Sequence, residues 1–65
     1  MPTIRVMLPA GAWSKEEKGK IAAELTEALS RVAQEVGKGD IKQYINAQIQ
    51  ETAEGGYAMG GNVVG

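Results

Sequence analysis

The chain has 65 residues, a mass of 6.9 kDa, no cysteine and no histidine. These two absences exclude disulfides, thiolate chemistry, histidine-dependent zinc and haem sites, and any imidazole acid or base. A chain this short buries a small share of its surface and usually depends on a staple or a partner subunit. With no disulfide available, the composition predicts a small domain that completes its core in an oligomer.

The charge and hydropathy of the chain limit the kinds of partner that it can bind. The net charge of −1 and the pI near 5.3 give no basic footprint for nucleic acid. No apolar run approaches the ~20 residues of a membrane helix, and residues 1–5 lack the basic-then-apolar layout of a signal peptide. We therefore expect a cytoplasmic protein with one domain over residues 1–65 and no nucleic-acid or membrane partner.

Residues 2–8 predict a first strand. Ile4, Val6 and Leu8 alternate with Thr3, Arg5 and Met7, which is the period of a half-buried strand. Proline is tolerated at the first strand residue because no ladder N–H is lost there. The segment after the strand, residues 9–12, is typical of a turn into a helix.

Residues 15–36 predict one long helix. Ser14 and Glu17 form an S-x-x-E capping box at its start, and Gly37 offers a C-cap because glycine takes the left-handed conformation at low cost. Apolar residues recur in steps of three and four and form one stripe, as in a helix that packs on a core: Ile21, Leu25, Leu29, Val32 and Val36.

The remaining segments complete the fold class. Residues 44–50 predict a second strand, since Ile45, Ala47 and Ile49 alternate with polar side chains. The glycine-rich residues 53–65 predict a short hairpin or an extended arm. A strand-helix-strand unit of this size pairs its strands in parallel through a right-handed crossover. We expect an α/β fold, a single β-α-β unit with a C-terminal hairpin, whose uncovered sheet edges favour oligomerisation.

The chain terminus is the unusual acid/base candidate. Met1 precedes the small residue Pro2, and removal of Met1 would expose a prolyl secondary amine at the start of a strand. An apolar site disfavours the charged form of an amine and lowers its pKa, which makes the free base available near neutral pH. Leu8, Tyr57 and Met59 are candidates to line such a site if chain ends from different subunits meet. The simpler alternative is that Pro2 is only a rigid strand start.

Nearly the whole chain resembles the 4-oxalocrotonate tautomerase family. The resemblance lies in the Met1-Pro2 opening, residues 14–18, residues 25–29 and the tail from Glu51 to Gly61. It implies β-α-β protomers assembled as a homohexamer, a trimer of dimers, with active sites shared between chains and no cofactor or metal. It also implies that the processed Pro2 is the general base, that Tyr57 is the apolar wall, and that Met59 lies beside it.

Two positions depart from the family pattern. The family's two substrate-binding arginines are replaced here by Trp13, before the helix cap, and by Asn46, in the second strand. Without them, bidentate capture of a carboxylate is lost. A neutral or monocarboxylate enol therefore suits the chain better than a dicarboxylate, with Trp13 as an apolar wall and Asn46 as an amide donor to an oxyanion.

Each of these residues also has a structural interpretation. Trp13 is also suited to pack on the first helical turn as a hydrophobic staple. Asn46 is suited to bond within a subunit interface, and Tyr57 to fill an intersubunit core. The sequence thus predicts a tautomerase or isomerase acting on a small keto or enol acid. The alternatives are a non-catalytic subunit of a homo- or hetero-oligomer, and a decarboxylase or dehalogenase on the same scaffold.

Overall fold

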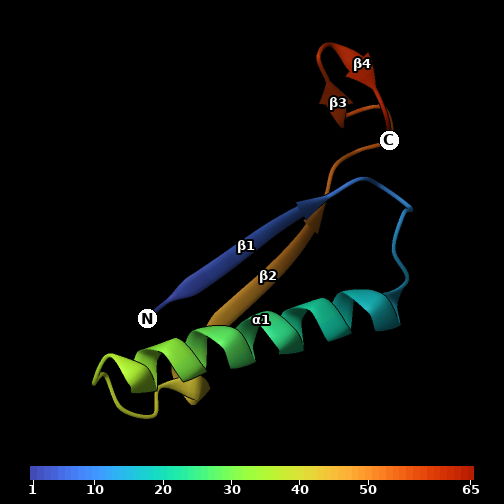
Figure 1. Ribbon diagram of the computed structural model, residues 1–65. Helices are drawn as coiled ribbons and strands as arrows, with labels where there is room; N and C mark the ends of the chain where they lie inside the picture. The colour runs from blue at the N-terminus through green and yellow to red at the C-terminus, as the bar shows by residue number, and fades with distance from the viewer.

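The computed structural model describes residues 1–65 and shows a β-α-β unit followed by a hairpin (Figure 1). The elements in chain order are β1 (Thr3–Leu8), α1 (Lys15–Glu35), the short 3-10 helix η1 (Lys42–Tyr44), β2 (Asn46–Glu51), β3 (Ala58–Met59) and β4 (Asn62–Val63). The predicted fold class is confirmed: β1 and β2 pair in parallel, and β3 and β4 form an antiparallel hairpin. None of the helices is long and apolar enough to cross a membrane.

Strands β1 and β2 run side by side with Thr3 opposite Asn46 and Leu8 opposite Glu51. Along β1 the exposed and half-buried residues alternate strictly, and Ile4 and Val6 lie on the half-buried face as predicted. Helix α1 covers one side of this sheet and packs mainly on β2 (Figure 1). The second strand begins two residues later than the sequence pattern predicts, because η1 takes up Tyr44.

The start of α1 is fixed by the predicted capping box. The Ser14 hydroxyl accepts a hydrogen bond from the Glu17 N–H at 3.1 Å, and the Glu17 carboxylate accepts one from the Ser14 N–H at 2.8 Å. Both interactions satisfy backbone donors that have no partner inside the helix. The helix ends at Glu35, one residue before the predicted end. Two residues later the backbone turns at Gly37, which has a φ of 84°.

We expect Ser14→Ala to lower the free energy of unfolding by about 1 kcal/mol, because the N-cap acceptor is lost. Urea unfolding at one fixed protein concentration measures this difference, since any self-association would make the midpoint depend on concentration. Lys15→Ala, at the neighbouring first position of the helix, is the control and leaves the midpoint nearly unchanged. Equal midpoints for wild type and Ser14→Ala would show that the capping box does not stabilise the fold.

The buried face of α1 is rotated away from the predicted apolar stripe. The two buried residues are Ser30 and Ala33, each 5% exposed, whereas Val32 is 48% and Val36 is 63% exposed. The most buried positions of the helix thus carry small side chains, which allow close packing. The expectation that the whole stripe faces the core is therefore wrong for Val32 and Val36, which lie on an open flank of the helix.

The hairpin extends beyond the C-terminal ends of β1 and β2, at the end of the sheet opposite the N-terminus (Figure 1). Gly60 and Gly61 connect its strands with φ values of 58° and 85°, which are the left-handed values that a tight hairpin turn requires. Its base is tied down by the Gly55 N–H, which donates to the Gly65 carbonyl at 2.9 Å.

The protomer is too open to be a complete globule. Its Cα radius of gyration is 14.6 Å, against about 11 Å for a compact domain of this length. Its accessible surface is 4818 Å², against about 4000 Å² for a compact protein of this mass. The excess of about 800 Å² matches what one partner buries in a standard protein interface. No large side chain is fully buried.

Candidate active site

The first group of candidate residues lies at the N-terminal end of the sheet. Pro2 is half-buried and directly precedes β1, and its carbonyl accepts a hydrogen bond from the Asn46 N–H at 2.9 Å. This bond fixes the Pro2 backbone against the first residue of β2. Met1 is 90% exposed, so its removal would take away little packing. The structure thus brings Pro2 and Asn46 together, which the sequence pattern alone does not show.

The second group lies at the C-terminal end of the sheet. Leu8 is the last residue of β1 and is half-buried, and Trp13 follows in the loop before α1 with 42% of its surface exposed. Tyr57 and Met59 belong to the hairpin beyond the same end (Figure 1). The Tyr57 carbonyl accepts from the Val64 N–H at 2.7 Å, and Tyr57 is half-buried while Met59 is 67% exposed.

The two groups are separated by the length of a strand. β1 has six residues, which at ~3.3 Å per residue span about 20 Å. A proton-transferring base must lie within hydrogen-bond reach of its substrate atom. The structure therefore does not bring Pro2 into one pocket with Trp13, Tyr57 and Met59 of the same chain.

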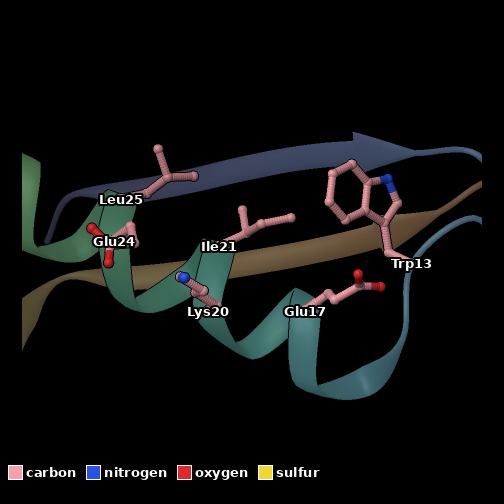
Figure 2. A pocket seen from close by; sticks show the side chains of 6 residues that line it. All are labelled: Trp13, Glu17, Lys20, Ile21, Glu24 and Leu25. Atoms are coloured by element: carbon pink, nitrogen blue, oxygen red, sulfur yellow. The ribbon is translucent and has the colours of Figure 1, made fainter.

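Trp13 lines an open groove of about 550 Å³ along the first turns of α1. Its other lining residues are Glu17, Lys20, Ile21, Glu24 and Leu25, and the Trp13 ring lies on the same side of the helix as Ile21 and Leu25 (Figure 2). A hydrophobic staple would join Trp13 to the fourth helical residue, which here is Lys18. Trp13 is thus part of the groove wall and not a simple staple. No group of three or more acidic residues is placed to hold a metal ion.

Glu51, the last residue of β2, connects three segments of the chain. One carboxylate oxygen accepts from the Lys18 Nζ of α1 at 2.8 Å, and the other accepts from the Gly11 N–H of the loop at 3.2 Å. Gly11 has a φ of 73°, which glycine adopts without strain. The carboxylate at the end of β2 therefore holds both the loop that carries Trp13 and the first turns of the helix.

These two contacts also change the titration of Glu51. The hydrogen bond from Lys18, followed by that from the Gly11 N–H, lowers the pKa of Glu51 below its ordinary value of 4.5. A carboxylate with a lowered pKa in the folded state contributes stability that is present above its unfolded pKa. That contribution is lost as the pH falls through the pKa of the folded state.

We therefore expect the wild-type protein to lose stability on acidification below about pH 4.5 more steeply than the Lys18→Met variant. The measurement is the urea midpoint as a function of pH at one protomer concentration. Glu16→Gln, which removes an exposed carboxylate from the first helical turn, is the control. If the urea midpoints of wild type and Lys18→Met fell equally steeply below pH 4.5, the hydrogen bond from Lys18 would not be the cause of the lowered pKa of Glu51.

The ion pair of Glu51 and Lys18 was not among the predicted site features. They are 33 residues apart and no short-range spacing connects them. The available signal was the parallel register: a strand that ends opposite Leu8 places its last side chain beside the turn that follows Leu8. An acidic residue at that point is a natural acceptor for a turn N–H.

The protein class follows from this β-α-β protomer, its terminal hairpin and the proline before β1. The family model described as "Tautomerase enzyme" matches residues 2–65. The chain therefore belongs to this family, which is part of the 4-oxalocrotonate tautomerase-like superfamily. Comparisons with curated proteins and with solved structures gave no significant match.

Proposed function

We propose that this chain is a cofactor-independent tautomerase, an isomerase in which Pro2, once Met1 is removed, is the general base. The carrying observation is the family match, which spans the chain from Pro2 to its last residue. It is supported by the backbone hydrogen bond that joins Pro2 to Asn46 and by the exposure of Met1. In this proposal residues 1–65 form one tautomerase-like domain.

The proposed reaction moves one proton. The lone pair of the prolyl nitrogen accepts a proton from the enol hydroxyl or from carbon, and the resulting ammonium returns a proton to the other end of the conjugated system. The composition of the substrate does not change, so no oxidant, reductant or cofactor is needed. Negative charge develops on the substrate oxygen during the transfer, and an amide N–H placed there stabilises it. Asn46 is the proposed donor.

The proposed substrate is a small enol or keto acid with at most one carboxylate. Trp13 and Asn46 are neutral, and they offer an apolar wall and one amide where an arginine pair would grip two carboxylates. Leu8, Tyr57 and Met59 complete the apolar surroundings in the proposal. Such surroundings keep an amine unprotonated near neutral pH.

The proposed site is shared between protomers of an oligomer. The strand-length separation within one chain means that the Pro2 end of one protomer has to meet the Trp13 and hairpin end of another. The open shape, the exposed flank at Val32 and Val36 and the unpaired sheet edges all provide surface for self-association. We propose a homohexamer, a trimer of dimers, as the assembly, and the cytoplasm stays our prediction for its location.

A second candidate function is a non-catalytic member of the family. It is favoured by the replacement of both arginine positions by Trp13 and Asn46. A chain that retains Met1 would have an amide at Pro2, with no basicity. Such a chain would serve as a structural subunit of a homo- or hetero-oligomer.

The test combines the mass of the purified native protein with an enol assay. We expect the mass of a chain that lacks Met1. We also expect the protein to ketonise a phenylenolpyruvate-type enol, which is measured as the loss of the enol's ultraviolet absorption. A dicarboxylate enol of similar size is the comparison substrate and should react more slowly. A native protein that retains Met1 and catalyses neither reaction would favour the structural subunit over the enzyme.

A further inference from the structure

We propose that Glu51 is a positioning residue that sets the location of Trp13 in the groove wall. The proposal rests on the proposed function only where it concerns substrate, because the effect on Trp13 itself is independent of any activity.

Along the chain, Trp13 lies between two residues whose backbone N–H groups donate hydrogen bonds to carboxylates. On its N-terminal side the Gly11 N–H donates to Glu51, and on its C-terminal side the Ser14 N–H donates to Glu17. The loop contains one further backbone hydrogen bond, from the Ala12 N–H to the Pro9 carbonyl, at a long 3.5 Å. The side-chain anchors therefore restrain this segment more than its own backbone does.

The two anchors have different origins. Glu17 belongs to the capping box, so its bond to the Ser14 N–H forms wherever the helix forms. Glu51 lies at the end of β2, so its bond to the loop depends on the position of the sheet relative to the helix. Lys18 Nζ binds the Oε1 atom of Glu51 at 2.8 Å and so orients the other oxygen, Oε2, toward the Gly11 N–H. Glu51 thereby couples the Trp13 loop to the strand that begins at the proposed oxyanion donor, Asn46.

The consequence is that one carboxylate sets where the Trp13 ring lies in the groove wall. With Glu51 in place, the loop holds the Trp13 ring on the side of the helix that carries Ile21 and Leu25 (Figure 2). Without it, the glycine-containing loop loses its long-range anchor and the ring is free to leave the groove. Glu51 therefore determines specificity through Trp13, without contacting substrate.

Trp13 is the single tryptophan of the chain, so its fluorescence reports its position directly. We expect Glu51→Ala to increase the quenching of this fluorescence by acrylamide about twofold, because the ring becomes more mobile and accessible. Lys18→Met keeps the Gly11 acceptor and gives a smaller increase. Glu51→Gln, which retains an oxygen for Gly11, lies closer to wild type than Glu51→Ala.

Lys42→Met is the matched control, because Lys42 forms the other ion pair of the protomer, with Glu27, and that pair does not involve the loop. Circular dichroism and sedimentation establish that each variant is folded and assembled, and Lys18→Met carries the test if Glu51→Ala does not fold. Quenching in Glu51→Ala and Lys18→Met equal to that in Lys42→Met would overturn the proposal.

Kinetics of the phenylenolpyruvate-type enol separate this proposal from the proposed function. If Trp13 binds substrate, Glu51→Ala raises KM about five- to tenfold and leaves kcat within about twofold, since uniform binding is lost. Increased quenching with an unchanged KM supports the positioning of Trp13 by Glu51 and contradicts the substrate role of Trp13. Unchanged quenching contradicts the positioning, whatever the kinetics.

Discussion

Replacing Pro2 with alanine is expected to lower kcat for enol ketonisation about 100-fold or more, the usual contribution of a positioned general base. The chain offers no histidine or cysteine to take over the proton. Alanine retains a terminal amine, so a residual rate is expected, but this amine lacks the ring that fixes the nitrogen at the start of β1. Because the base acts in the transition state, KM should change little.

The control for this experiment is Lys38→Ala, an exposed residue of the turn after α1, which should keep the wild-type rate. Mass spectrometry has to show that Met1 is absent from each protein that is compared. A processed Pro2→Ala variant with the wild-type kcat would exclude Pro2 as the base, and the search would then move to the tyrosines.

Mixing two weakly active variants is expected to restore activity if the site is shared. Pro2→Ala lacks the base, and Trp13→Ala lacks the apolar wall, a loss of about 2 kcal/mol or ~30-fold in kcat/KM for a large aromatic contact. In randomly mixed symmetric oligomers, about one quarter of the sites combine an intact Pro2 from one chain with an intact Trp13 from another. Activity should then rise to about a quarter of the wild-type value.

The measurement is the activity after the two variants are unfolded together in urea and refolded at equal concentrations. Wild type mixed with Pro2→Ala is the control and should retain about half of the wild-type activity. If Pro2 and Trp13 of one chain formed the site, the mixed sample would show only the mean of its two components. That result would contradict a site assembled from two protomers.

The local features of the fold were predictable because local chemistry determines them. The capping box at Ser14 and the alternation along β1 follow from hydrogen-bonding and side-chain geometry within a few residues. The rotation of α1 on the sheet was not predictable, because a helical stripe does not indicate which of its flanks meets the sheet and which stays open. Burial of Ser30 and exposure of Val36 follow from that tertiary choice.

The candidate site was predictable only as a set of residues. The sequence pointed to Pro2 and to the aromatic residues of the loop and hairpin, and the structure placed them at opposite ends of the sheet. Their roles stay predictions. The ion pair of Glu51 and Lys18 was missed, because no short-range spacing connects the two residues and their contact depends on how the crossover brings the end of β2 beside the first turns of α1.

The proposed function requires the Pro2 nitrogen to be a free amine that titrates near neutral pH. Nitrogen NMR of protein labelled with ¹⁵N-proline tests it directly, since the chain contains two prolines, Pro2 and Pro9. We expect one signal to move with pH through a midpoint near neutrality, while the Pro9 amide signal stays constant and serves as the internal reference. Two signals that both stay constant across this range would contradict the account.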